Sequence, residues 1–177
     1  MRMETAVFGG GCFWCTEATF QQLKGVSSVT SGYAGGAMNA PSYHDVTTGE
    51  TGHAEVIKIE FDPKVIPYND LLEIFFNTHN PTSYNRQGND VGTQYRSIIL
   101  YTTEEQKVMA QQARDALITS RQFEGPIVTE IEPLKEFYSA EQYHQDYYNR
   151  NKTDGYCEYV ISPKLQKLRE KYSDKLK

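Results

Sequence analysis

Residues 5–17 read TAVFGGGCFWCTE, and this stretch decides the fold. Thr5 to Phe8 is a short apolar run, which is typical of a buried strand. The three glycines that follow allow the backbone to turn sharply and to approach a ligand closely. The spacing of apolar residues from Thr16 to Leu23 then predicts a short helix. The stretch therefore predicts a strand, a glycine turn and a helix, with Cys12 at or near the helix N-terminus.

Cys12 is the candidate nucleophile of this turn. The unpaired backbone N–H groups and the dipole at a helix N-terminus favour a thiolate, which lowers the pKa of a thiol placed there. An ordinary thiol, with a pKa of about 8.5, is only a few per cent ionised at neutral pH. We therefore expect a lowered pKa at Cys12. The structural alternative is a tight turn that carries a buried, inert cysteine.

Cys12 and Cys15 also form a C-x-x-C pair, which leaves other classes of site open. The bulky Phe13 and Trp14 between the two thiols disfavour a thioredoxin-like dithiol. A zinc-binding module usually draws four ligands from two such pairs, and no second pair with metal spacing is present. A cysteine hydrolase or acyltransferase needs an orienting histidine. The histidines available to either alternative are His44, His53, His79 and His144.

Beyond this turn the pattern alternates between strands and helices. Periodicity predicts strands at residues 29–33, 53–61, 95–102 and 128–131, and helices at residues 68–78, 103–120 and 163–177. Another helix is predicted to begin at Ser139, where Gln142 would complete a capping box. Strands interleaved with helices indicate an α/β or α+β sandwich, and periodicity alone does not decide the topology.

Composition favours one domain spanning residues 1–177, because no linker or repeat divides the chain. The net charge of -5 argues against general nucleic-acid binding. No apolar run approaches ~20 residues, so we expect no membrane span. The segment from Met1 to Thr5 lacks the apolar core of a secretory signal. Three cysteines, an odd number, suit thiols in a reducing compartment, so we expect a cytoplasmic protein without a bound metal or cofactor.

Glu55 is the candidate acid. In the strand at residues 53–61, alternation places Glu55 on the same side as Ile57, Ile59 and Phe61. Burial among apolar side chains disfavours the charged form of a carboxyl and so raises its pKa. The sequence therefore predicts that Glu55 is a neutral proton donor. The alternative is an ordinary carboxylate in water at a frayed strand end.

The turn at residues 89–97 brings further polar side chains. Asp90 and Arg96 could form an ion pair with a purely structural role. Tyr43 and Tyr95 are possible hydrogen-bond donors, but the chain has 13 tyrosines and most of them are expected to be amphipathic packing residues.

The stretch Gly10–Trp14 closely resembles the active-site motif of A-type peptide methionine sulfoxide reductases. Further motifs match that family in the same order over almost the whole chain. They are Gly32–Gly36, Pro41–Tyr43, Thr51–Glu55, Gly92–Ser97 and Glu141–Gln145. One motif alone would be suggestive, whereas this many together are highly specific.

The resemblance implies an α+β fold, a two-layer sandwich with a split β-α-β (ferredoxin-like) core and long wrapping C-terminal loops and helices. It implies thiol-dependent reduction of the S epimer of methionine sulfoxide, free or in proteins, and a role in protein repair and oxidative-stress defence. Cys12 would be the nucleophile and Glu55 the proton donor. The residues implied to bind the substrate are Phe13 and Trp14 around its methyl group, Tyr43 and Tyr95 at its oxygen, and Asp90 as a supporting acid.

A second thiol would convert the sulfenic acid formed on Cys12 into a disulfide, which thioredoxin would reopen as the external reductant. Cys157 matches a C-terminal resolving cysteine of many relatives. Gly155 and the polar stretch at residues 149–154 suggest a mobile loop that would let Cys157 reach Cys12. Cys15, about one turn from Cys12, is the alternative resolving thiol, and many relatives carry no cysteine there. We favour Cys157.

Overall fold

A mixed sheet forms the centre of the molecule. The computed structural model describes residues 2–177. Met1, the first residue of the segment in which the sequence predicts no secretory signal, lies outside them. Six strands pair in the order β7-β6-β1-β3-β2-β8. All neighbours are antiparallel except β6 and β7. Their bounds are Glu4–Gly9 (β1), Val26–Ala34 (β2), Ala54–Phe61 (β3), Ile98–Tyr101 (β6), Glu130–Pro133 (β7) and Phe137–Ser139 (β8).

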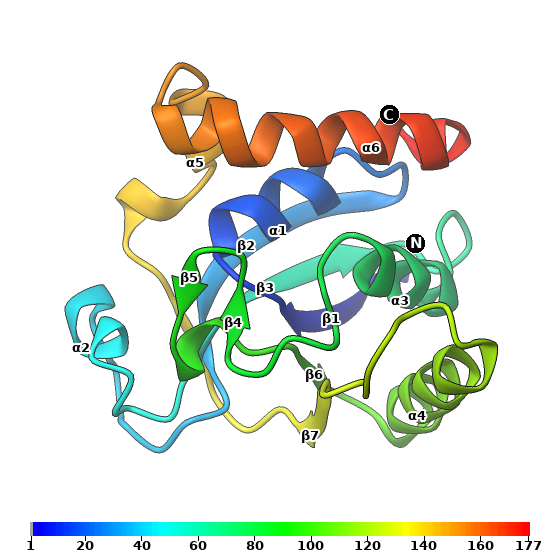
Figure 1. Cartoon of the computed structure of the whole chain (residues 1–177), viewed down its shortest axis with the longest axis horizontal. Helices are drawn as coiled ribbons and strands as arrows, with labels where there is room; N and C mark the ends of the chain where they lie inside the picture. Colours follow the sequence, from blue (N-terminus) through cyan, green and yellow to red (C-terminus); the bar gives the residue numbers. More distant parts are fainter. Residues whose placement is uncertain (1) are drawn as a thin grey trace.

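Helices cover the sheet, and the last of them lies across the first (Figure 1). The α-helices are Phe13–Gln21 (α1), Tyr43–Thr47 (α2), Tyr68–Asn77 (α3), Glu104–Ser120 (α4), Tyr147–Arg150 (α5) and Ser162–Tyr172 (α6). Short 3-10 turns are Thr93–Tyr95 (η1), Gln142–His144 (η2) and Ser173–Lys175 (η4), and a π-helical turn, Cys157–Ile161 (η3), leads into α6. A separate two-stranded ribbon joins Arg86–Gln87 (β4) to Asp90–Val91 (β5).

The apolar core lies on one face of the sheet. Phe8, Ile57 and Ile59 point to this face and are fully buried against side chains of α1, α3 and α6. The opposite face carries a much smaller cluster around Val7 and Val56. Because α1 is pressed between the sheet and α6, its N-terminal turn is held from both sides, and this turn carries Cys12.

Most predicted elements are confirmed within a few residues, including the strand that carries Glu55. The helix predicted at Ser139 is wrong, because Phe137–Ser139 is strand β8 and pairs with β2. The turn that begins at Gln142 is a 3-10 helix of three residues. Tyr95 belongs to turn η1 rather than to the strand predicted from it, and β6 begins at Ile98. At Ser139 tertiary pairing overrides a local capping signal, which by itself contributes only about 1 kcal/mol.

Within residues 2–177, no helix has both the length and the apolar character that crossing a membrane requires.

Candidate active site

The glycine turn sets the position of Cys12. Gly11 has φ +90°, a value that residues with a side chain rarely adopt, and its N–H donates to the carbonyl oxygen of Tyr95 at 3.2 Å. At Gly9 a Cβ atom would lie 2.9 Å from the carbonyl oxygen of Glu55. The turn therefore packs directly on β3. Cys12 follows as the N-cap residue of α1, and it is half-buried.

Glu55 lies directly beneath this helix start. Its side chain is 1 % exposed, and its Oε1 accepts a hydrogen bond of 3.1 Å from the backbone N–H of Phe13. Burial raises the pKa of Glu55 to about 8, although the Phe13 N–H partly opposes that effect. The predicted burial of Glu55 among Ile57 and Ile59 is confirmed. At neutral pH most of this carboxyl is therefore protonated, one peptide unit from Cys12.

The thiols of Cys12 and Cys15 interact, so the two groups titrate as a pair. Burial, followed by the hydrogen bond with Cys15, raises the pKa of Cys12 well above its ordinary value. The same hydrogen bond lowers the pKa of Cys15 to about 7. The expectation of a lowered pKa at Cys12 is therefore wrong for the protein without substrate. Cys12 does lie at the helix N-terminus, which favours a lower pKa. Exclusion of water from its sulfur, however, raises the pKa by more than the helix terminus lowers it.

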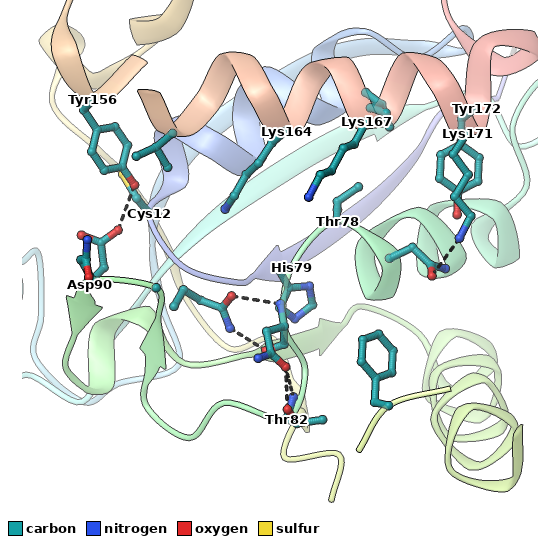
Figure 2. Close-up of a pocket in the computed structure, with 18 of the residues that line it drawn as sticks. Cys12, Thr78, His79, Thr82, Asp90, Tyr156, Lys164, Lys167, Lys171 and Tyr172 are labelled. Carbon is teal, nitrogen blue, oxygen red and sulfur yellow. Dashed lines mark hydrogen bonds between the residues drawn. The ribbon is translucent and has the colours of Figure 1, made fainter. Parts of the chain in front are cut away.

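A chain of hydrogen bonds connects this thiol pair to Asp90. The hydroxyl of Tyr156 donates to Asp90 Oδ2 at 2.9 Å and lies 3.4 Å from Cys15 Sγ. Asp90 does not pair with Arg96 as the sequence allowed, because Arg96 binds Glu130 at 3.0 Å instead. Figure 2 shows Cys12, Tyr156 and Asp90 together at one end of a groove. The hydroxyl of Tyr156 thus connects Asp90 to Cys15.

Charged groups of this site affect the pKa values of both candidate tyrosines, Tyr43 and Tyr95. Tyr43 is the first residue of α2, and its backbone N–H donates to Glu141 Oε2 at 2.8 Å. Ser42 caps this helix by forming a capping box with Asp45. Burial, then the charges of Glu55 and Cys12, raise the pKa of Tyr43 to about 12. Burial and Glu55 also raise the pKa of Tyr95. Both hydroxyls therefore keep their protons at neutral pH and can donate hydrogen bonds.

The two aromatic residues after Cys12 occupy different surroundings. Phe13 is fully buried and packs its ring against Tyr33 and His144. Trp14 is half-buried and stacks on Tyr147, with ring centroids 3.7 Å apart and planes 4° apart. The indole N–H of Trp14 donates to His144 Nδ1 at 3.1 Å. These contacts fix the Trp14 ring beside Cys12, so that it can form a rigid apolar wall.

Cys157 does not lie in a loop, which corrects the expectation from Gly155 and the polar stretch before it. It is the first residue of η3, and it is fully buried. Burial, then the charges of Asp154 and Cys15, raise the pKa of its thiol. All three cysteines are free thiols. Cys157 is therefore held in a buried helical turn and not in an exposed loop.

Sequence reasoning missed several residues around the site. Tyr156 was not singled out, although it directly precedes Cys157. Glu141 accepts from the Tyr33 hydroxyl at 2.9 Å as well as from Tyr43, and Tyr147 supports Trp14. Each comes from a segment more than 60 residues from its partner, so no local spacing connects them. In the sequence, only the family-like motif Glu141–Gln145 indicates a functional role for this region.

The histidines favour neither alternative class of site. Both ring nitrogens of His53 are engaged, one by the N–H of Gly36 at 3.1 Å and the other by the carbonyl oxygen of Met38 at 2.6 Å. Burial lowers the pKa of His144, whose Nδ1 already accepts from Trp14. Among residues 2–177, no cluster of three or more His, Cys, Asp or Glu side chains could hold a metal ion.

A groove of about 920 Å³ begins at Cys12 and continues along α6 as far as Tyr172 (Figure 2). We call this cavity the α6 groove. Tyr156 and Asp90 line its end at Cys12. The wall of the groove that α6 forms carries lysine side chains.

Comparison with known proteins gives one consistent result. Residues 4–176 match the family model described as peptide methionine sulfoxide reductase. The chain is 56% identical to the peptide methionine sulfoxide reductase MsrA of Haloquadratum walsbyi over 98% of both proteins. It is 54% identical to MsrA of Sulfolobus acidocaldarius over 98% of this chain and 97% of that protein.

Solved structures show the same relationship. The reduced form of Mxr1 from Saccharomyces cerevisiae is 33% identical, with a TM-score of 0.80 and coverage of 88% of each chain. Methionine sulfoxide reductase A of Corynebacterium diphtheriae is 34% identical, with a TM-score of 0.75 over 84% of this chain and 75% of that one. Fold, site and sequence agree: the chain is an oxidoreductase that belongs to the peptide methionine sulfoxide reductase family.

Proposed function

We propose that the protein reduces the S epimer of methionine sulfoxide, free or within proteins, through a sulfenic acid on Cys12 and an intramolecular disulfide. One observation carries this proposal. The Phe13 N–H to Glu55 hydrogen bond of 3.1 Å holds a buried carboxyl, with its pKa raised to about 8, at the residue directly after Cys12. A nucleophile and a neutral acid next to each other are what a sulfoxide requires, because its oxygen leaves only when protonated. The choice of epimer follows from the resemblance to A-type reductases.

The first step transfers oxygen from the substrate to the enzyme. The sulfur of Cys12 attacks the sulfoxide sulfur, while Glu55 gives its proton to the sulfoxide oxygen and takes up the proton of the Cys12 thiol. The hydroxyl then passes from the substrate sulfur to the Cys12 sulfur: the substrate's bond to oxygen and the bond between the two sulfurs break, a bond between the Cys12 sulfur and oxygen forms, and methionine leaves with Cys12 as a sulfenic acid. The substrate sulfur gains two electrons and the Cys12 sulfur loses two. Glu55 thus relays one proton from the Cys12 thiol to the oxygen, and its carboxyl ends the step protonated.

Neighbouring side chains would bind the substrate. The protonated hydroxyls of Tyr43 and Tyr95 would donate to the sulfoxide oxygen and stabilise the charge that develops there. Trp14, fixed by its stack on Tyr147, would wall a pocket for the methyl group, with Phe13 beneath it. Asp90 would act through Tyr156, whose hydroxyl lies between it and Cys15.

The second step forms a disulfide and releases water. We propose that the thiol of Cys157 attacks the sulfenic acid on Cys12, after η3 has unwound far enough to expose it. Tyr156 would have to leave Asp90 and Cys15 in that movement, because it is the residue directly before Cys157. Cys15 lies in the same helical turn as Cys12, where its backbone N–H donates to the Cys12 carbonyl oxygen at 3.1 Å, and it remains the alternative resolving thiol.

Counting thiols distinguishes the two resolving cysteines. The reduced protein, which has three cysteines, is treated with one equivalent of substrate without reductant. If Cys157 resolves, the Cys15→Ser variant loses both of its thiols. The Cys157→Ser variant then loses only one and keeps a sulfenic acid that dimedone labels. Loss of two thiols in Cys157→Ser would instead assign the resolving role to Cys15.

An external dithiol must reopen the disulfide by exchange. We propose thioredoxin in this role, as the resemblance implies. The yeast relative Mxr1 has been solved in complex with Trx2. Such a cycle needs a compartment that keeps thiols reduced, and we propose the cytoplasm. Repair of oxidised proteins under oxidative stress would be its result.

We also interpret the central strands as a split β-α-β core. The order β6-β1-β3-β2, with α1 between β1 and β2 and α3 between β3 and β6, supports a ferredoxin-like arrangement.

The direct test of the proposed function is turnover of purified epimers. With dithiothreitol or thioredoxin as reductant, the protein should reduce S-epimer methionine sulfoxide, and the R epimer should give no more than background. Methionine is measured by chromatography. Equal rates with both epimers would contradict the proposed selectivity, and no turnover of either would contradict the proposed reaction.

A further inference from the structure

The α6 groove is larger than the proposed reaction requires. Of the residues that line it, only Cys12, Asp90 and Tyr156 take part in that reaction. The rest of its volume of about 920 Å³ extends away from Cys12 towards Tyr172. A cavity of this size accommodates a ligand as large as a short peptide segment. The groove is therefore a candidate site for the chain that flanks a methionine sulfoxide in a protein.

One wall of the groove carries a row of positive charges. Lys164, Lys167 and Lys171 recur at helical spacing on one face of α6 and all line the groove. Figure 2 shows Lys164 and Lys167 pointing from α6 into it. Across the described residues the ion pairs are Arg96 with Glu130 and Lys175 with Asp70, so no carboxylate neutralises the three lysines. We call them the lysine row.

The facing wall does little to balance this charge. Asn77, Asn80 and Gln87 line it with neutral amides, and Lys171 Nζ donates to Asn77 Oδ1 at 3.1 Å. The carboxylates that line the groove are Asp90, which accepts from Tyr156, and Glu124. The protein as a whole carries a net charge of -5, so the lysine row opposes the overall sign. It offers an acidic chain an attractive path to Cys12 on a surface that otherwise repels it.

We propose that the α6 groove binds an acidic flank of the substrate polypeptide, with aspartate or glutamate side chains placed against the lysine row. This inference rests on the proposed function, because the flank is that of a methionine sulfoxide at Cys12. Lys164 and Lys171 are separated by about 10 Å along the helix at a rise of about 1.5 Å per residue. An extended peptide covers that distance with about three residues. The enzyme therefore prefers methionine sulfoxide that has several acidic residues close to it on one side.

The test compares matched peptides. In each, methionine sulfoxide is followed or preceded by Asp-Glu-Asp, or by the uncharged Asn-Gln-Asn of the same shape. Exposed ion pairs each contribute only about 0.2–1 kcal/mol, so three together give a preference of about tenfold in kcat/KM at low salt. We expect this ratio of acidic to neutral peptide from one flank, and we expect it to fall towards one in 0.5 M salt.

Two triple variants locate the effect. K164Q/K167Q/K171Q should bring the ratio of kcat/KM values close to one. The control K24Q/K64Q/K135Q removes the same charge from exposed lysines that do not line the groove, and it should keep the ratio. A wild-type ratio of one for both flanks would overturn the proposal. So would a ratio that persists in the first variant, or that is lost equally in the control.

Direct binding separates this proposal from the proposed function. Fluorescence anisotropy of labelled acidic and neutral peptides on Cys12→Ser protein measures the same preference without turnover. If the wild-type protein reduced neither peptide, the proposed reaction would fail, while tighter binding of the acidic peptide would still support the groove. Equal binding of both peptides, with normal turnover of both, would overturn the groove and leave the reaction intact.

Discussion

Cys12→Ser should abolish reduction of methionine sulfoxide, with a loss in kcat/KM of at least about 10⁴-fold. A serine hydroxyl is protonated at every working pH and is a far weaker nucleophile than a thiol, so no covalent intermediate can form. The change is nearly isosteric at an N-cap position, where serine is itself a favoured residue. The fold should therefore survive, and the lost activity should report the lost sulfur alone.

The matched control for this variant is Cys15→Ser. A single turnover without reductant needs the nucleophile but no resolving thiol, so this variant should still release about one equivalent of methionine. Circular dichroism and thermal unfolding show whether each variant folds. Turnover by folded Cys12→Ser protein at more than a hundredth of the wild-type rate would remove Cys12 from the proposed chemistry.

Local pattern sufficed where one physical effect dominates. Alternation along residues 53–61 placed Glu55 among apolar side chains, and the structure buries it there to 1 % exposure. The glycine turn and the helix beyond it likewise follow from residues 9–21 alone. In these cases the period of the strand and the conformational freedom of glycine decide the outcome, and both are visible in a single segment.

Other features arise only when distant segments meet. The pKa of Cys12 depends on how tightly α6 and the sheet exclude water from the start of α1, and no window around residue 12 contains that information. Cys157 follows a glycine and polar residues, yet packing against α1 and α6 makes it a buried helical residue. The Asp90–Tyr156–Cys15 chain joins three separate segments. Burial and pairing at long range therefore explain the main differences from the sequence prediction.

Glu55→Gln should reduce the rate of the first step by about 10²–10⁴-fold, the range expected for loss of a general acid. The amide keeps the size of the side chain, and its oxygen can still accept from the Phe13 N–H, but it has no acidic proton to give. Glu60→Gln is the matched control, because Glu60 lies on the same strand, on the opposite face to the core, and should react normally. Methionine release in a single turnover, measured by rapid quench, gives the rate.

The pH dependence provides the sharper test, because the folded-state pKa of Glu55 is raised to about 8 from an ordinary value of 4.5. The acid is fully protonated well below pH 8, so the wild-type rate should fall about tenfold per pH unit above that value. In Glu55→Gln this alkaline decline should vanish, and the rate should rise with pH as Cys12 ionises. Stability changes in the window below that decline: the folded state holds a proton that the unfolded chain has released, so wild-type stability should fall between pH 4.5 and 8, and Glu55→Gln should lack that part of the fall. An unchanged alkaline decline in Glu55→Gln would assign the proton to another group.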